Sequence, residues 1–498
     1  MRKFVTGALS TLLVSGLLAS GPLVLSRASG AALGNDTVKQ AHATAKAACS
    51  PNGPARVAHC SALIRTNTVS PSRLFHASNS STQSIGANGA YSPSYLQSAY
   101  NVGSFGSAND GAGRIVAIVD AYNDPRVVSD LARYRQSFGL PACPQRVVSA
   151  KATTCSIQVV NQSGVRAPLP ASSVGWGQET SIDVDMVSAI CPLCQILLVE
   201  AQSSAISDLG TAVNTAVAMH ADVVSNSYGA AEYPSEASDA RMYFNHPGIP
   251  IVAAAGEMGQ GVEFPAASPT VVAVGGTTLI QNSDNGVRNG FETAWSKTSS
   301  GCSAYEPKPV WQGNLTCTNR SVADVAAVAD PATGVWIYDS YKASGSLIAG
   351  GTSVATPIIS AMFALAKIGN ASNADPVAHL YQSAAALSPV NAASSFGQIG
   401  YEGATGLGTP GATPNSLPAF GTSPLGSTIS SSTPALPYST SNTGAMTPDW
   451  TPPAFRNEPV VGYNTHEGVD RPSDSPTPSV PPLGKCPIRE GAGPPSPR

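Results

Sequence analysis

The chain has 498 residues, enough for one large domain or two to three average ones. Charged residues make up only 11% of it, while Gly (47) and Pro (41) are plentiful and hydrophobic residues reach an ordinary 42%. Lys and Arg (27) nearly balance Asp and Glu (30). This composition excludes a coiled coil or polyelectrolyte, and it lacks the basic excess that nucleic-acid binding requires.

Residues 1–30 are expected to be a secretory signal. A basic start precedes an uncharged, Leu- and Val-rich stretch from Phe4 to Ser26, and Ala28-Ser29-Gly30 offers a cleavage site. A membrane anchor is the alternative, but glycines and a proline interrupt the apolar run. We therefore expect a secreted protein, extracellular or at the cell surface, with no membrane association after signal removal.

Three further regions follow from composition. Residues 31–86 are rich in Ala, Ser and Asn with little hydrophobic periodicity, which indicates a short propeptide or a loose extension. Residues 87–420 carry the domain. In residues 421–498, 44 of 78 residues are Ser, Thr, Pro or Gly, which predicts a disordered C-terminal tail.

The domain alternates short apolar runs with amphipathic stretches of helical length. Strands that are apolar on both sides and separated by helices predict a mostly parallel sheet with helices on both faces, a doubly wound α/β fold. The segments that carry this pattern are Ile115–Val119, Val127–Phe138, Ile157–Val160, Ile196–Val199, Leu209–Met219, Val223–Val224 and Ile251–Ala254.

Nine cysteines in an exported chain are expected to form disulfides. Cys191-Pro-Leu-Cys194 could instead be redox-active or half a zinc site, but a second Cys-x-x-Cys and a neighbouring His cluster are both missing from the sequence. Cys486 is left over. The other eight fall into close pairs: Cys49/Cys60, Cys143/Cys155, Cys191/Cys194 and Cys302/Cys317.

Ser353 lies in Gly350-Gly351-Thr352-Ser353, a glycine-rich turn followed by an apolar stretch. Such a turn lets the backbone approach a substrate, and the helix start offers free N–H groups to a developing oxyanion. The pattern therefore predicts a nucleophile, although a serine at this junction can also be a simple N-cap.

A serine nucleophile needs a base, and none of the seven histidines lies in a typical catalytic setting. Glu179 and Asp183 are spaced i and i+4, which places both carboxyls on one face of a predicted helix from Glu179 to Ile190. Two neighbouring carboxyls beside the apolar face of a helix have shifted pKa values, so that they share one proton or one of them loses it. The alternative is a pair of solvated surface acids.

These motifs, in this order, resemble the sedolisin (serine-carboxyl peptidase) family, from about Tyr91 to about Thr409. The matching stretches are Ser92-Pro-Ser-Tyr-Leu-Gln-Ser-Ala-Tyr100, Ile118-Val-Asp-Ala-Tyr122, Glu179-Thr-Ser-Ile-Asp183, Val224-Ser-Asn-Ser-Tyr-Gly229, Phe264-Pro-Ala-Ala-Ser268, Ala273-Val-Gly-Gly-Thr277 and the Gly-Thr-Ser turn.

The resemblance implies a subtilisin-like fold in which Ser353 is the nucleophile, Glu179 the general base and later acid, and Asp183 the carboxyl that orients Glu179. It also implies that Ser227, Tyr228 and Gly229 form the edge that pairs with an extended substrate. A carboxylate base stays ionised where imidazole would be protonated, so we expect activity at acidic pH.

Two positions depart from the family pattern. Glu257 stands where relatives carry an aspartic acid that donates to the oxyanion; glutamic acid can donate the same bond. Relatives also bind calcium near the end of the domain, but Ser388-Pro-Val-Asn391 and Gly400-Tyr-Glu-Gly403 alter the ligand positions, so calcium is doubtful.

The prediction is a secreted serine-carboxyl endopeptidase with polypeptide substrates. The alternative is a catalytically weak or inactive relative that binds peptides or surfaces.

Overall fold

The computed structural model describes residues 44–51, 53–66, 90–105, 111–280, 292–313, 315–366, 375–390 and 403–411. These residues belong to one compact unit, Met1–Thr428. The predicted signal, the predicted C-terminal tail and Cys486 lie outside the described residues.

An eight-stranded sheet forms the centre of the described unit. Its spatial order is β12-β11-β9-β7-β4-β6-β5, with β15 also paired to β11, and every pairing is parallel except that of β11 with β12. All residues of β4, β6 and β11 are buried, as runs that are apolar on both faces predict. The strands are β4 (Ile115–Ala121), β5 (Ile157–Asn161), β6 (Gln195–Ala201), β7 (Val223–Asn226), β9 (Ile251–Ala254), β11 (Val271–Leu279), β12 (Glu292–Ala294) and β15 (Val325–Val328).

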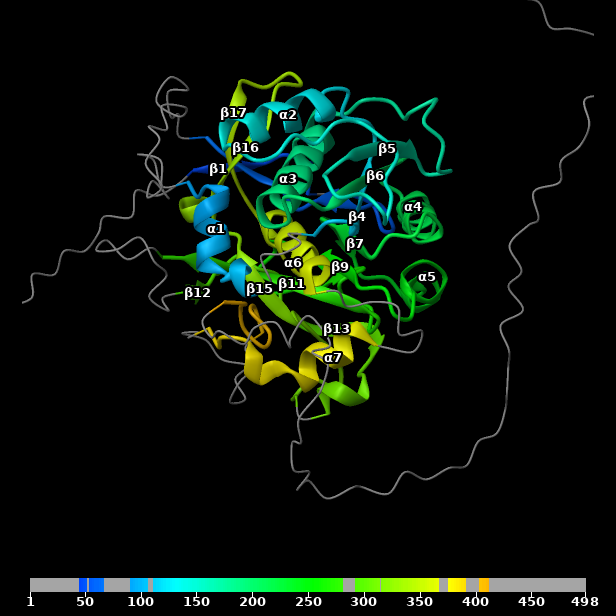
Figure 1. Ribbon diagram of the computed structural model, residues 1–498. Coiled ribbons are helices and arrows are strands. Elements are labelled where there is room, and N and C mark those ends of the chain that lie inside the picture. The colour runs from blue at the N-terminus through cyan, green and yellow to red at the C-terminus, as the bar shows by residue number, and fades with distance from the viewer. Residues whose placement is uncertain are drawn as a thin grey trace, which may run out of the picture. The chain divides into compact units, whose positions relative to one another are not determined.

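Helices cover this sheet on both faces (Figure 1). Helices α3 and α6 pack against each other and α6 lies on β7, β9, β11 and β15, whereas α4 packs on β4 and β6 from the other side. The helices are α1 (Pro93–Ala99), α2 (Val127–Ser137), α3 (Val174–Ile190), α4 (Ile206–Ala218), α5 (Glu236–Asp239), α6 (Thr352–Ala366) and α7 (Pro376–Gln382). The predicted doubly wound α/β fold is confirmed.

Three smaller sheets surround the central one. Their orders are β1-β3-β17-β16, β10-β8-β2 and β13-β14. The first two join strands that are distant in the sequence, because the N-terminal strands β2 and β3 pair with β8 and β17. The strands are β1 (Ala45–Ala47), β2 (His59–Cys60), β3 (Leu63–Arg65), β8 (Tyr228–Ala231), β10 (Glu263–Phe264), β13 (Gly301–Pro307), β14 (Asn319–Val322), β16 (Val335–Asp339) and β17 (Gly345–Gly350).

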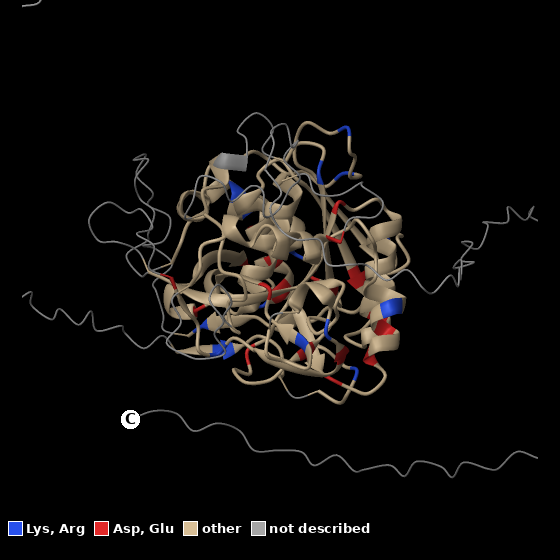
Figure 2. Cartoon of the chain, turned by 90° about the horizontal axis from the view of Figure 1, so that it is seen from below, with Lys and Arg blue, Asp and Glu red and all other residues tan. Residues whose placement is uncertain are grey.

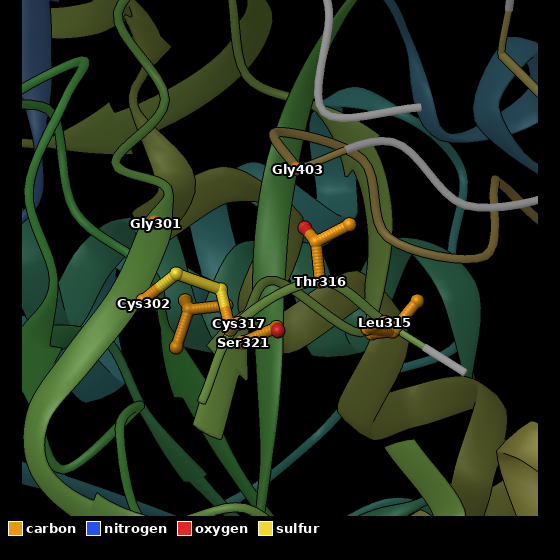
Figure 3. A pocket seen from close by; sticks show the side chains of 8 residues that line it. Gly301, Cys302, Leu315, Thr316, Cys317, Ser321 and Gly403 are labelled. Atoms are coloured by element: carbon orange, nitrogen blue, oxygen red, sulfur yellow. A yellow bond between two sulfur atoms is a disulfide. The ribbon is translucent and has the colours of Figure 1, made fainter. Parts of the chain in front are cut away.

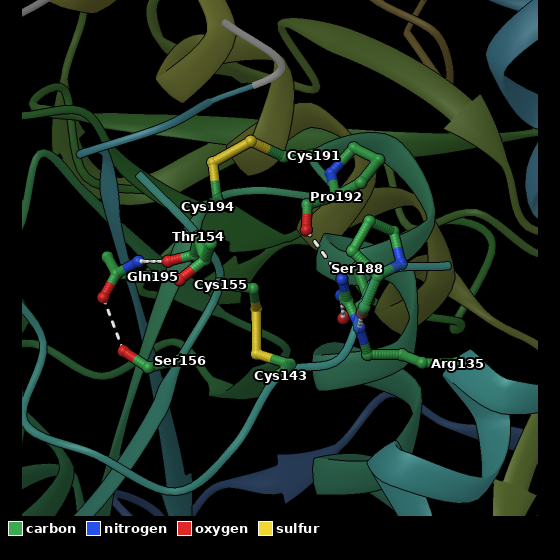
Figure 4. The surroundings of a disulfide bond; sticks show 11 residues. Arg135, Cys143, Thr154, Cys155, Ser156, Ser188, Cys191, Pro192, Cys194 and Gln195 are labelled. Atoms are coloured by element: carbon green, nitrogen blue, oxygen red, sulfur yellow. Dashed lines mark hydrogen bonds between the residues drawn. A yellow bond between two sulfur atoms is a disulfide. The ribbon is translucent and has the colours of Figure 1, made fainter. Parts of the chain in front are cut away.

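Four disulfides tie these elements, and all four predicted close pairs are confirmed. Figure 4 shows two of them, Cys143–Cys155 and Cys191–Cys194, near the buried guanidinium of Arg135. Arg135 donates to Ser188 Oγ at 2.8 Å and to the carbonyl of Pro192 at 2.7 Å. The Cys-x-x-Cys unit is therefore a structural bridge at the end of α3.

Charged residues are few along the described chain, and basic ones are scattered rather than clustered in the view of Figure 2. The fully buried ion pair of Arg320 with Asp324 lies beside β15. Asp324 Oδ1 accepts from Arg320 Nη1 at 2.8 Å and from the hydroxyl of Tyr381 at 2.9 Å, so it fixes the loop between β14 and β15. Within the described ranges, no helix has the length and apolar character needed to cross a bilayer.

Candidate active site

Ser353 is the second residue of α6, directly after the turn that ends β17. Its side chain is fully buried. Its hydroxyl donates to Glu179 Oε2 at 2.7 Å and also lies 3.3 Å from the carbonyl oxygen of Ser227. The predicted nucleophile and the predicted base are thus in direct hydrogen-bond contact across 174 residues of sequence.

Helix α3 carries both predicted carboxyls one turn apart, and both are fully buried. Asp183 Oδ1 accepts a hydrogen bond from Ser227 Oγ at 2.6 Å. Glu179 Oε1 and Asp183 Oδ2 accept no hydrogen bond from any described residue. The alternative of two solvated surface acids is therefore wrong, because α3 packs against α6 and places these side chains inside the domain.

Burial is the largest influence on these carboxyls. It raises the pKa of Glu179 well above its ordinary value, and the charges of Asp183 and Asp120 raise it further, while the Ser353 hydroxyl opposes the shift. Burial and Asp120 likewise raise the pKa of Asp183, against the hydrogen bond from Ser227. The pKa of Asp120, at the end of β4, rises to about 7, chiefly through burial. Burial therefore favours the neutral form of these carboxyls in the covered site.

Glu257 follows β9 in the sequence, and its side chain contacts Thr352, the first residue of α6. Its Oε1 accepts from the backbone N–H of Thr352 at 2.5 Å and from Thr352 Oγ1 at 2.6 Å. Burial raises the pKa of Glu257 to about 7, against these two hydrogen bonds. Below that pH the carboxyl is protonated and can donate, next to the N–H groups of a helix start.

The predicted substrate strand, Ser227 to Gly229, pairs with the chain's own N-terminal segment. In the antiparallel pair of β2 and β8, His59 stands opposite Gly229 and Cys60 opposite Tyr228. The pairing continues beyond β2, since the N–H of Ser61 donates to the carbonyl of Ser227 at 3.2 Å. Extended peptides add to an exposed strand edge in this way.

We call residues 44–51 and 53–66 the N-terminal hairpin. On its other edge, the N–H of Ala58 donates to the carbonyl of Ser204 at 2.7 Å. After Ser61 the chain continues as β3, which pairs with β17 on one side and with β1 on the other. The disulfide Cys49–Cys60 closes the hairpin. These residues are therefore not a loose extension. Their assignment as a propeptide stays a prediction.

The N-terminal hairpin passes directly over the nucleophile. A Cβ atom built on Gly351, two residues before Ser353, would stand 2.0 Å from the carbonyl oxygen of Ser61. Gly351 has φ +97°, a conformation that favours glycine, so this turn accepts both the strained backbone and the close approach. The sequence alone did not reveal this contact, because three short strands in an Ala- and Ser-rich segment lack clear periodicity.

Two other regions bear on ligand binding. The region in which calcium binding is doubtful is only partly described: Ser388 forms a backbone bridge with Thr409, Pro389 brings no side-chain ligand, and residues 391–402 lie outside the described chain. No cluster of three or more potential metal ligands occurs among the described residues. A cavity of about 60 Å³ lies beside the Cys302–Cys317 disulfide, and none of the predicted site residues lines it. Figure 3 shows the residues that line this cavity.

Comparisons with known proteins agree with this architecture. The sequence model of the subtilase family matches residues 169–407, which include Glu179, Glu257 and Ser353. Kumamolisin from Bacillus sp. (strain MN-32) is 30% identical over 311 residues, covering 55% of this chain and 52% of kumamolisin. The chain is similar in sequence to the sedolisins.

Two further comparisons concern sedolisin itself. Sedolisin from Pseudomonas sp. (strain 101) is 33% identical over 167 residues, covering 30% of this chain and 28% of that protein. The solved structure of Pseudomonas sedolisin, a serine-carboxyl proteinase complexed with pseudo-iodotyrostatin, covers 65% of this chain and 96% of its own at 24% identity and a TM-score of 0.54. That likeness shows the subtilisin-like fold. The chain spans about half the length of kumamolisin and less of sedolisin.

Proposed function

We propose that this chain is a secreted serine-carboxyl endopeptidase that hydrolyses peptide bonds at acidic pH. The observation that carries the proposal is the 2.7 Å hydrogen bond from Ser353 Oγ to Glu179 Oε2, in a fold whose relatives are peptidases. Asp183 and Ser227 support it, because the Ser227 hydroxyl holds the second carboxyl at 2.6 Å on the same helix.

The geometry supports acyl transfer in two steps. Ser353 Oγ attacks the substrate carbonyl while its proton passes to ionised Glu179. The oxyanion then accepts hydrogen bonds from protonated Glu257 and from the helix start, and Glu179 returns the proton to the leaving amine. Water, deprotonated by Glu179, hydrolyses the acyl-enzyme, and its proton restores the Ser353 hydroxyl.

Asp183 has a positioning role in this scheme. With one proton shared between it and Glu179, the Glu179 carboxylate is kept in place for Ser353. Because burial is the largest cause of the raised pKa of Glu179, exposure to water should lower that pKa toward the ordinary carboxyl range. The proposed acidic activity therefore requires that the N-terminal hairpin leave the site. No step uses a metal.

The test is cleavage of a denatured protein by the purified chain between about pH 3 and 7, compared with Ser353→Ala and Glu179→Gln. Ser360→Ala is the matched control, since this buried serine lies on the same helix and donates only to the carbonyl of Thr356. We expect the first two variants to lose at least about 1000-fold in kcat and the control to keep its activity. Cleavage that persists in Ser353→Ala would refute the nucleophile.

A folded wild-type chain that cleaves nothing, even with the hairpin removed, would favour the peptide-binding alternative.

A further inference from the structure

We propose that Asp239 and Tyr233 form a guanidinium-binding subsite for the sixth residue before the scissile bond of a peptide. This inference rests on the proposed function and adds an arginine, distant from the reacting atoms, to the substrate class of that site. Its basis is the contact that Arg56 of the N-terminal hairpin makes with these two side chains.

The subsite lies just beyond the strand that pairs with the hairpin. Tyr233 follows β8 by two residues, and Asp239 is the last residue of α5. One oxygen of Asp239, Oδ2, accepts from Arg56 Nη2 at 2.7 Å and from the Tyr233 hydroxyl at 2.7 Å. The guanidinium carbon of Arg56 also lies 5.3 Å from the centroid of the Tyr233 ring. The Asp239 side chain is 8% exposed and that of Arg56 51%, so a long side chain reaches a largely buried carboxyl from the surface.

Contacts within the domain hold the subsite in place without Arg56. The Tyr233 ring packs edge-on against Phe264 at a centroid distance of 5.6 Å, and the Tyr233 N–H donates to Glu236 at 2.8 Å. Burial and the hydrogen bond to Asp239 raise the pKa of the Tyr233 hydroxyl, which therefore stays a donor. Departure of the hairpin would leave Asp239 with this donor but without its cation, and such a carboxylate favours the binding of another cation.

The backbone of the hairpin shows which residue of a peptide reaches this subsite. The N–H of Ser61 donates to the carbonyl of Ser227, and the Ser61 carbonyl oxygen lies against Gly351, two residues before the nucleophile. Ser61 therefore occupies the place of the residue that precedes the scissile bond. Counted back from Ser61 as the first, Arg56 is the sixth.

Main-chain hydrogen bonds guide a peptide along this path. Beyond the pairing of β2 with β8, the hairpin pairs with the loop between β6 and α4. The N–H of Ala58 donates to the carbonyl of Ser204 at 2.7 Å, and the N–H of Ile206 donates to the carbonyl of Arg56 at 2.9 Å. Such backbone pairing accepts different side chains, so a substrate on the same path brings its sixth side chain to Asp239.

Arginine suits this subsite better than lysine does. A planar guanidinium stacks on the Tyr233 ring while one of its N–H groups donates to Asp239, whereas the ammonium of lysine is a point charge that does not stack. Arg56 itself has φ +67°, in a turn that the N–H of Val57 closes by donating to the carbonyl of Pro54 at 3.1 Å. A peptide that starts at its sixth residue needs no such turn.

The first test compares acetylated peptides that start at the sixth residue before the bond and differ only there, with Arg, Lys or Gln. The enzyme is the full chain with Cys49→Ser/Cys60→Ser, because loss of the disulfide loosens the hairpin. The hairpin competes equally with every peptide, so its occupancy cancels in the ratio of two kcat/KM values. We expect an Arg-to-Gln ratio of at least about five, with Lys between them, and a ratio of about one in Asp239→Asn.

Asp222→Asn is the matched control. Asp222 also pairs with an arginine, Arg114 at 2.7 Å, but it precedes β7 and lies at the opposite end of that strand from β8. The control should keep the full Arg-to-Gln ratio. A ratio near one in the parent enzyme, or a ratio that survives Asp239→Asn, overturns the subsite.

The second test needs no cleavage. The same peptides, fluorescently labelled, are bound to the loosened full chain carrying Ser353→Ala, and Kd is read from anisotropy. We expect the Arg peptide to bind at least about fivefold more tightly than the Gln peptide, and this difference to be lost in Asp239→Asn. Equal Kd values, or no binding by either peptide, overturn the subsite. A difference in Kd without cleavage by the Ser353 enzyme refutes the peptidase and keeps the subsite.

Discussion

Replacement of Glu257 tests the proposed oxyanion stabilisation, since one of its oxygens already accepts both donors of Thr352. If the other carries the proton that meets the oxyanion, Glu257→Ala removes one donor, which costs roughly 2.7–4 kcal/mol of transition-state stabilisation. We expect kcat to fall about 100- to 1000-fold with little change in KM, because the bond is made chiefly in the transition state.

The pH profile makes this prediction more specific. The pKa of Glu257 is raised to about 7, so its proton is present below that pH and lost above it. Removal of the N-terminal hairpin exposes the site and should lower this pKa, so activity of the hairpin-free enzyme should decline with rising pH at or below about 7. Glu257→Gln keeps an N–H donor at every pH, so it should retain kcat within about tenfold and remove this decline.

The assay is kcat against pH for hairpin-free wild type, Glu257→Ala and Glu257→Gln. Glu306→Gln is the matched control, because burial also raises the pKa of Glu306 to about 7, on β13 and without contact to Thr352. A Glu257→Ala enzyme within about threefold of wild type would refute the reasoning. So would a Glu257→Gln profile that keeps the decline, or a Glu306→Gln profile that loses it.

Three further outcomes follow from the structure. The double variant Cys49→Ser/Cys60→Ser should loosen the N-terminal hairpin and raise the initial rate of peptide cleavage by unprocessed enzyme; equal rates with and without the disulfide would contradict this. Asp324→Ala leaves Arg320 as an unpaired buried charge, so we expect a loss of about 3–5 kcal/mol, read from the urea midpoint. A carboxyl with a raised pKa binds protons more readily in the folded protein than in the unfolded chain. Its contribution to the stability of the folded protein is therefore complete below about pH 4 and is lost as pH rises through 7. The Ser353→Ala protein should accordingly show a higher Tm at pH 4.5 than at pH 7.5. The acids with a pKa raised to about 7 are Asp120, Asp124, Glu257 and Glu306.

The regular parts of the fold were predictable because their sequence patterns are strong. The run Ile251–Ala254 is β9 with the same bounds, and the predicted helix from Glu179 is the C-terminal part of α3. The contact of Ser353 with Glu179 follows once both lie on helices that pack together, although only the seven motifs together indicated the partner.

The N-terminal hairpin could not be predicted, because its stability comes from pairing with distant strands rather than from its own residues. Its strands have two or three residues each, and β1 is exposed along its whole length.

Cleavage of the N-terminal hairpin would not by itself release the hairpin from the active site. If the bond between Ser61 and Ala62 were hydrolysed, β1 would still be paired with β3, and Cys60 would still be joined to Cys49. The ion pair of Arg56 with Asp239, at 2.7 Å, would be a third interaction that holds the N-terminal fragment in place. The new carboxyl end would stay beside Ser353, where religation competes with departure. The protein would then be cleaved but still inactive. The lifetime of this latent form would be set by the dissociation rate of the fragment rather than by the rate of the chemical step.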